Sequence, residues 1–286
     1  MTSTLVRQYL PRAGAVPRVD QDTRARDWAE IQERMLVPLY EAVYERLEVG
    51  SGTRLLGLGC GSGLALLMAA SRGATVTGVD PGSPERVRLA RERLLPEARG
   101  TRACAATRVI DGDPGDAARA PGEAAYNLVT AFEPIGCMAG DSEGLAELLA
   151  ETTPLVAHGT PVVLVGWGPP ERCTTSSVLR VATRLADPVR TAASWRPALR
   201  DDLEEVAQRA GLRPDGSGRV ACPFGYADID SAVRGLLSTG LFDAAIIATD
   251  RDQVEKELAE VLHTHRRRDG TVWMPNVFRY LVARTP

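Results

Sequence analysis

The sequence has few of the residue patterns that mark metal, redox and nucleic-acid sites. Its five cysteines contain no CxxC pair and no histidine clusters with them, so neither a zinc site nor a redox-active disulfide is expected. Lys256 is the only lysine, and the net charge of −3 is accompanied by no basic stripe, which disfavours a nucleic-acid partner. An odd, scattered set of cysteines fits a reducing cytosol, and a cytoplasmic location is therefore expected.

Long apolar runs are also missing. No stretch is long enough to cross a membrane, and the polar opening Met1-Thr2-Ser3-Thr4 is followed by no apolar segment, so neither a membrane partner nor a signal peptide is expected. With 286 residues, 44% hydrophobic and 25% charged, the chain has the composition of a globular protein. Its length allows one large α/β domain with insertions or two small domains.

The clearest pattern present is a strand, a glycine-rich turn and a helix. A short apolar strand around 53–56 leads into four alternating glycines, and strong helix formers follow from 64 to 70. Glycine permits positive φ and leaves no Cβ to block a ligand lying against the backbone, while the first N–H groups of the helix are unpaired. This order is typical of the opening of a nucleotide-binding α/β unit. The four glycines are Gly57, Gly59, Gly61 and Gly63.

The spacing of these glycines argues against a dinucleotide. In the GxGxxG fingerprint the third glycine would fall on Ser62 or on Leu64, depending on the register. Neither register fits, so an NAD-dependent oxidoreductase is the weaker hypothesis.

The rest of the chain continues the α/β alternation. Repeated units of a short buried strand and a helix predict a parallel, doubly wound sheet. A helix capped by Asp22-Thr23 is expected to run to about 48, with a break or kink at Pro38. We expect residues 1–50 to form an N-terminal helical lid and 51–286 the main domain, with helical cap insertions at about 169–199 and 227–268. Strands are expected at 74–79, 106–110, 126–131, 161–165, 220–222 and 272–283, and helices at 84–95, 142–156 and 199–210.

The run LGCGSG at 58–63, with Cys60 inside it, resembles motif I of the class I S-adenosylmethionine-dependent methyltransferases. Gly57 stands where that family usually carries an acidic residue that helps to order the loop. The segments 165–173, 222–226 and 276–281 resemble a group of small-molecule methyltransferases from actinomycetes. The resemblance implies a Rossmann-like seven-stranded sheet with helical caps. It also implies S-adenosylmethionine as cofactor and a small-molecule acceptor, with a role in secondary metabolism.

Several residues are candidates for holding this cofactor. Asp80 ends the second strand, with Pro81 after it, and an acidic side chain there can accept both ribose hydroxyls. One of Asp113 and Asp116 is expected to receive the adenine amino group, and the spacing does not separate the two. Phe132, at the end of the fourth strand, is expected beside the adenine or the methionine chain.

The acceptor side is less defined. Glu133 follows Phe132 and is predicted to act as a base or a hydrogen-bond partner, with a solvated loop glutamate as the alternative. Methyl transfer displaces an activated leaving group, so alignment and water exclusion are the main tasks of the protein, and a base is needed only if the acceptor's proton leaves early. A protein that binds the cofactor without transferring methyl, either a regulator or a cyclase-like relative, is the other hypothesis. Aromatic residues of the insertions predicted to line an acceptor pocket are Trp195, Tyr226 and Phe242.

Overall fold

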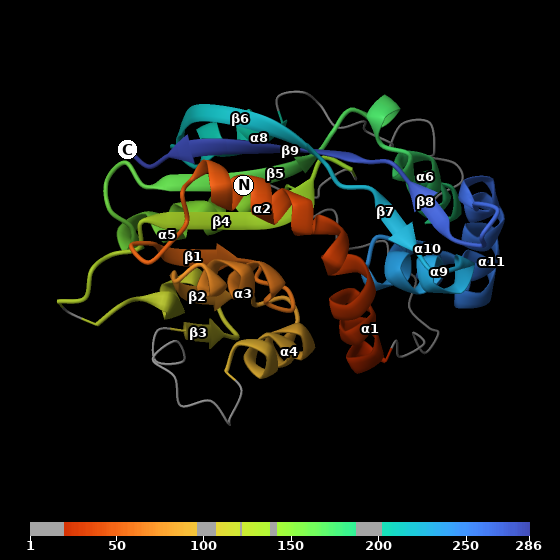
Figure 1. Ribbon diagram of the computed structural model, residues 1–286, viewed down its shortest axis with the longest axis horizontal. Helices are drawn as coiled ribbons and strands as arrows, with labels where there is room; N and C mark the ends of the chain where they lie inside the picture. The colour runs from red at the N-terminus through yellow and green to blue at the C-terminus, as the bar shows by residue number, and fades with distance from the viewer. Residues whose placement is uncertain (1–19, 96–106, 121, 138–141, 187–201) are drawn as a thin grey trace, which may run out of the picture.

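The computed structural model describes residues 20–95, 107–120, 122–137, 142–186 and 202–286 (Figure 1). Trp195, a predicted acceptor contact, lies outside the described residues.

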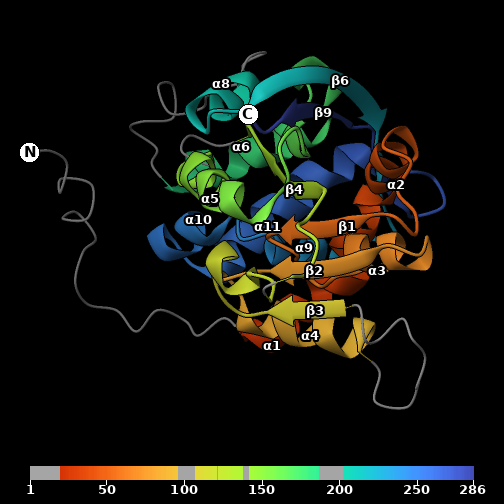
Figure 2. The ribbon, with the colours of Figure 1, turned by 90° about the vertical axis from the view of Figure 1, so that its left-hand side faces the viewer.

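A seven-stranded sheet forms the centre of the molecule. The five strands from β3 to β5 are parallel, whereas β9 runs antiparallel to both β5 and β6. The predicted Rossmann-like α/β sheet is confirmed, but the expectation of a wholly parallel sheet is wrong for β9. The chain re-enters the sheet from the end where the parallel strands finish, so its last strand must run backwards (Figure 1). Figure 2 shows β6 and β9 toward one edge of the sheet and β2 and β3 toward the other. In sheet order the strands are β3 (Thr107–Ile110), β2 (Thr75–Val79), β1 (Arg54–Leu58), β4 (Leu128–Ile135), β5 (Pro161–Trp167), β9 (Val277–Arg284) and β6 (Arg213–Ala221).

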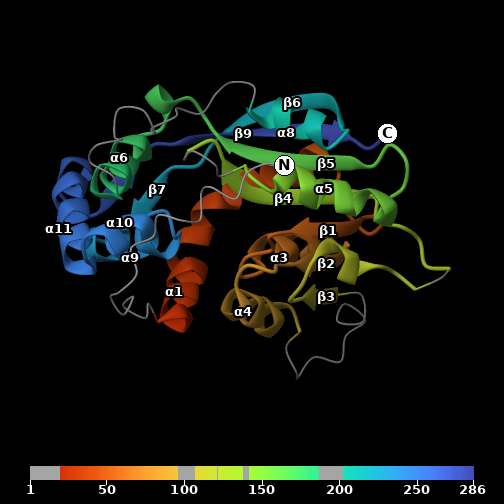
Figure 3. The same ribbon diagram turned by 180° about the vertical axis from the view of Figure 1, so that it is seen from behind.

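Alternate residues of each central strand face opposite layers, as the two-residue period of a strand requires. Leu55 belongs to the hydrophobic core that includes residues of α2 (Val37–Arg46), α3 (Leu64–Ser71) and α4 (Pro84–Leu94). Leu56 belongs to the core that includes residues of α5 (Leu145–Thr152) and α8 (Asp202–Arg209). Figures 1 and 3 show these two helical layers on opposite faces of the sheet. The strands are therefore buried on both sides, which explains their nearly continuous apolar sequences.

The N-terminal helical segment is irregular. It begins with α1 (Gln21–Asp27), continues as a π-helical turn η1 (Trp28–Gln32) and a 3₁₀ turn η2 (Glu33–Leu36), and ends with α2. The predicted cap at Asp22-Thr23 is wrong, because Asp20 caps the helix by accepting the N–H groups of both residues. The predicted break near Pro38 is confirmed, since Pro38 lies in the first turn of α2, where its missing N–H leaves no intrahelical bond unmade.

A group of helices lies beyond the carboxyl ends of the parallel strands (Figure 1). Within the first expected cap insertion lies α6 (Thr175–Ala186), which contacts α10 (Asp243–Ala248) and α11 (Arg251–Leu262). α9 (Ile229–Ser238) contacts both α1 and α11, so these helices connect the N-terminal segment to the rest of the group. None of the helices formed by the described residues is long and apolar enough to span a membrane. Short 3₁₀ turns elsewhere are η4 (Pro114–Ala117), η5 (Thr153–Leu155), η6 (Pro170–Arg172) and η7 (His263–His265).

Two strand predictions near the C-terminus need correction. The strand expected at 272–283 is two strands, because the chain leaves the ladder at Pro275 and Asn276 between β8 (Val272–Met274) and β9. β8 pairs with β7 (Phe224–Tyr226) in a separate two-stranded sheet. The strand expected at 220–222 extends back to Arg213, through glycine-rich sequence that an edge strand tolerates.

Candidate functional site

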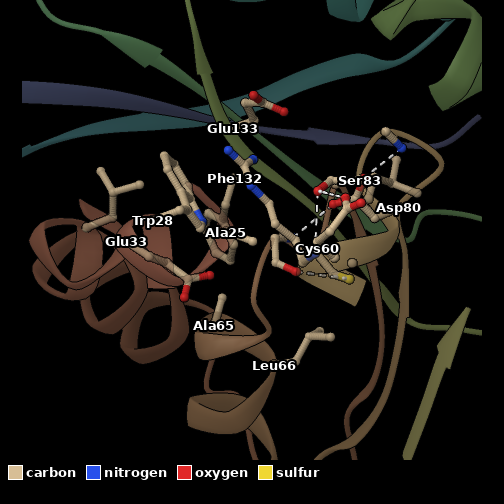
Figure 4. Close-up of a pocket in the computed structure, with 18 of the residues that line it drawn as sticks. Ala25, Trp28, Glu33, Cys60, Ala65, Leu66, Asp80, Ser83, Phe132 and Glu133 are labelled. Atoms are coloured by element: carbon tan, nitrogen blue, oxygen red, sulfur yellow. Dashed lines mark hydrogen bonds between the residues drawn. The ribbon is translucent and has the colours of Figure 1, made fainter. Parts of the chain in front are cut away.

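A cavity of about 580 Å³ lies at the carboxyl ends of β1, β2 and β4. Its walls come from the glycine loop after β1, the segment that connects β2 to α4, the end of β4 and the N-terminal helical segment. Ligands of open α/β sheets bind at this edge of the sheet. Figure 4 shows Trp28 and Glu33 on one side of the cavity and Asp80 and Ser83 on the other.

The glycine loop lies against the cavity with left-handed backbone at its second and third glycines. Gly59 has φ 62° and Gly61 has φ 54°. A Cβ at Gly61 would lie 3.1 Å from Glu33 Oε1 and 3.3 Å from Trp28 Nε1, and one at Gly59 would lie 3.7 Å from Glu133 Oε2. Both positions line the cavity, so any side chain there would enter the space that a ligand needs.

The other two glycines differ in role. Gly57 lines the cavity, but a Cβ there would lie 3.0 Å from Leu66 Cδ2, so a larger residue would press on α3. Gly63 does not line the cavity. A Cβ at Gly63 would lie 2.9 Å from Ala90 Cβ, so this glycine allows α3 and α4 to pack closely rather than facing a ligand.

Asp80 closes the loop from the end of β2. Its carboxylate accepts the N–H of Gly61 at 3.1 Å and the N–H of Gly82 at 3.0 Å. Burial raises the pKa of this carboxyl, and the two backbone hydrogen bonds oppose that shift. Gly82 lines the cavity, whereas Pro81 is exposed and does not.

The N-terminal segment supplies a buried carboxylate to the glycine loop. Glu33 is buried, and its carboxylate accepts the Ser62 N–H at 3.2 Å and also the Ser62 hydroxyl. Arg93 of α4 forms a salt bridge with the same carboxylate at 2.9 Å. Glu33 therefore fixes the glycine loop between the N-terminal segment and α4. Sequence reasoning missed it, because no spacing rule connects a helical glutamate with a loop 29 residues away.

The end of β4 brings Phe132 and Glu133 to the cavity. The pairing with β5 changes register between Ala131 and Ile135, and such irregularities re-aim side chains at strand ends. Phe132 is buried with its ring 4.8 Å from that of Tyr40, while Glu133 has an exposed side chain. Both line the cavity, as does Tyr40.

Cys60 also lines the cavity, but it is unsuited to nucleophilic chemistry. Its thiol is buried, and this burial raises its pKa to about 12. The thiol therefore stays protonated at neutral pH and serves as a small apolar group.

Besides Gly63 and Pro81, four further predicted contacts lie outside the cavity lining. Asp116 accepts the backbone N–H of Asp113 at 3.0 Å in the turn after β3, and neither lines the cavity. Tyr226 is buried and donates to Gln32 Oε1 at 2.9 Å, and Phe242 is fully buried. The expectation that these two aromatic residues face an acceptor is corrected: they pack inside the helical group, because the apolar surfaces of its helices need a core of their own.

The comparisons with known proteins agree with this architecture. No protein-family model matches the chain, and no curated protein matches it in sequence. Among solved structures, an S-adenosylmethionine-dependent methyltransferase from Thiobacillus denitrificans, in complex with S-adenosylhomocysteine, is similar with a TM-score of 0.52 and 19% identity, over 94% of this chain and 99% of that one. The YcgJ protein from Bacillus subtilis is similar with a TM-score of 0.52 and 15% identity, over 86% of this chain and 97% of that one. At these identities the likeness shows the fold.

Proposed function

We propose that the protein is an S-adenosylmethionine-dependent methyltransferase that acts on a small molecule. The observation that carries the proposal is the cavity between the glycine loop and Asp80, at the carboxyl ends of the strands. The shared fold of the Thiobacillus denitrificans methyltransferase, crystallised with S-adenosylhomocysteine, supports it. The volume of about 580 Å³ is in the range of pockets that enclose a nucleoside-sized ligand.

The residues present fit this cofactor. Gly59 and Gly61 leave open the space that side chains would fill, so a ligand can lie directly on the backbone. The carboxylates of Glu33, Asp80 and Glu133 line the same cavity and suit a ligand with positively charged groups. When bound, S-adenosylmethionine supplies a methyl group activated by its sulfonium.

The chain's own part in the reaction is to bind, to orient and to exclude water. Asp80 is placed to accept ribose hydroxyls with the lone pairs that Gly61 and Gly82 leave free. Phe132 and Tyr40 supply an apolar wall. Glu133 is the group best placed to orient an acceptor or to accept its proton, since it lines the cavity at the end of β4.

We also propose the N-terminal segment, 20–46 in the described part, as a lid. Its residues line the cavity, and Glu33 holds it on the glycine loop. The caps, α6 with α9–α11, support this lid, because the Arg234 guanidinium of α9 pairs with the Asp27 carboxylate of α1. Asp243 of α10 also lines the cavity itself.

A turnover assay tests the proposal. Methyl-labelled S-adenosylmethionine is incubated with the protein and a panel of small phenols, amines and carboxylic acids, and both labelled product and S-adenosylhomocysteine are quantified. The proposal predicts equal amounts of the two with at least one acceptor class. Tight binding of S-adenosylhomocysteine without turnover of any acceptor would favour a protein that binds the cofactor and transfers nothing.

A further inference from the structure

Two hydrogen-bond donors, one from the N-terminal segment and one from α4, lie together at the cavity. One is the indole N–H of Trp28, in η1, and the other is the guanidinium of Arg86, in the first turn of α4. Both residues line the cavity. Neither was singled out by the sequence, because a tryptophan and an arginine 58 positions apart share no motif.

The Trp28 N–H is a buried donor without a partner. Among the residues that the structure describes, no acceptor forms a hydrogen bond with Nε1, although the atom is shielded from solvent. A buried donor without an acceptor destabilises a protein, so a ligand that supplies the acceptor gains that energy back. Nε1 is also one of the atoms that a side chain at Gly61 would strike, at 3.3 Å. It is therefore beside the stretch of backbone on which a ligand would lie.

Two contacts position the Arg86 guanidinium and leave some of its N–H groups available to a ligand. Its guanidinium carbon lies 4.3 Å from the centre of the Trp28 ring, and Nη2 donates to the Ser238 carbonyl oxygen at 3.0 Å. A guanidinium carries five N–H donors, and within the described part of the chain no salt bridge engages this one. Burial lowers the pKa of Arg86, an effect that the charges of Glu133 and Asp80 oppose.

Two neighbouring arginines are paired with carboxylates, whereas no salt bridge among the described residues engages Arg86. Arg24 is paired with Asp243 at 2.9 Å, and Arg93 is paired with Glu33 at 2.9 Å. The charges of Glu133 and Asp80 raise the pKa of Arg86 and so offset its positive charge in part. A ligand group that accepts hydrogen bonds and carries negative charge would satisfy Trp28 and Arg86 together.

We propose that Trp28 and Arg86 form a binding site for a carboxylate. The inference rests on the proposed function, which offers two sources of that group: the amino-acid end of the cofactor, or an acidic acceptor. In either case the Trp28 N–H and the Arg86 guanidinium hold a carboxylate oxygen each, and the lid becomes part of ligand recognition. The stacked geometry fixes both donors before the ligand arrives, which lowers the entropy lost on binding.

Calorimetric titration of the wild type and of Trp28→Phe distinguishes the two sources. The substitution removes the N–H and keeps a ring under Arg86. Three titrants are used: S-adenosylhomocysteine, its decarboxylated analogue, and benzoate added to protein saturated with S-adenosylhomocysteine. If the site holds the cofactor carboxylate, Trp28→Phe should lower the affinity for S-adenosylhomocysteine by about 10- to 100-fold and keep the affinity for the decarboxylated analogue within twofold of the wild type. If the site holds an acceptor carboxylate, the affinity for S-adenosylhomocysteine should stay unchanged and the affinity for benzoate should fall by a similar factor.

Trp273→Phe is the matched control. Arg267 stacks on Trp273 at 4.5 Å, and this second arginine–tryptophan pair is outside the cavity lining. It should change none of the three affinities. Arg86→Met, checked for an unchanged far-ultraviolet spectrum, should reproduce the selective loss.

The proposal is overturned if Trp28→Phe weakens S-adenosylhomocysteine and its decarboxylated analogue equally, or if it alters no titration. Failure of the wild-type protein to bind S-adenosylhomocysteine at all is a different result. It overturns the proposed function and removes the cofactor as source, and benzoate titrated against the protein alone then decides whether the carboxylate site exists.

Discussion

Glu33→Gln removes one negative charge from the contact between the lid and the glycine loop while keeping the shape of the side chain. In the wild type this carboxylate is buried, accepts two hydrogen bonds from Ser62 and pairs with Arg93. Removing one partner of a buried ion pair typically destabilises a protein by about 3–5 kcal/mol. Here the loss is smaller, because the Arg93 side chain is 25% exposed and can turn to water, and the amide oxygen still accepts the Ser62 N–H. We expect about 2 kcal/mol.

For a chain of this size, that loss corresponds to a fall in Tm of about 4–8 °C. The same substitution should lower the affinity for S-adenosylhomocysteine by roughly tenfold, since the loop that Glu33 fixes is the floor of the cavity. Thermal unfolding followed by circular dichroism gives the first quantity, and calorimetric titration gives the second.

Glu30→Gln is the control, because Glu30 is exposed on the same helical segment. It removes the same charge and should leave both quantities unchanged. If Glu33→Gln melts within 1 °C of the wild type and binds equally well, Glu33 does not anchor the glycine loop and the reasoning is refuted.

Three further outcomes are expected. Asp80→Asn should weaken the binding of S-adenosylhomocysteine by about 1.5–3 kcal/mol and also lower Tm, because one of the N–H groups of Gly61 and Gly82 then faces the amide NH2. Because burial raises the pKa of Asp80, the wild type should lose affinity as pH falls through that raised value, and a pH-independent affinity in this acidic range would contradict the role. Tyr226→Phe should lower the free energy of unfolding by about 1–3 kcal/mol, since Gln32 loses its donor, and should leave the acceptor KM unchanged. A raised KM with unchanged stability would show instead that Tyr226 contacts the acceptor. Glu133→Gln should lower kcat at least tenfold if the carboxylate accepts a proton, and only a few-fold if it orients the acceptor, as initial rates over a pH series will show.

The parts predicted from sequence are those that local patterns encode. β1, the glycine loop and the helix after it are contiguous, and two of the alternating glycines, Gly59 and Gly61, have left-handed backbone beside the cavity. The break at Pro38 was predictable for a similar reason, since proline acts on its own helix. Asp80 was placed at the cavity by its position at the end of an apolar strand.

The parts that the sequence did not predict depend on tertiary contacts. Glu33 reaches Ser62 only because an irregular helix folds over the loop. Tyr226 and Phe242 were interpreted as pocket residues because aromatic composition does not tell which way a ring points, and both are buried in the packing of the cap. The end of β8 at Pro275 was visible in the sequence as a strand-breaking residue, but the separate pairing of β8 with β7 was not.

Titration of the wild type and of Gly61→Val with S-adenosylhomocysteine and with NAD tests most directly whether the glycine loop forms the floor of an S-adenosylmethionine site. A valine at this position is strained, because Gly61 has φ 54°, and its side chain would enter the cavity toward Glu33 and Trp28. The account predicts that the wild type binds S-adenosylhomocysteine and not NAD, and that folded Gly61→Val binds neither. Preferential binding of NAD, or undiminished binding of S-adenosylhomocysteine by a folded Gly61→Val protein, would contradict it.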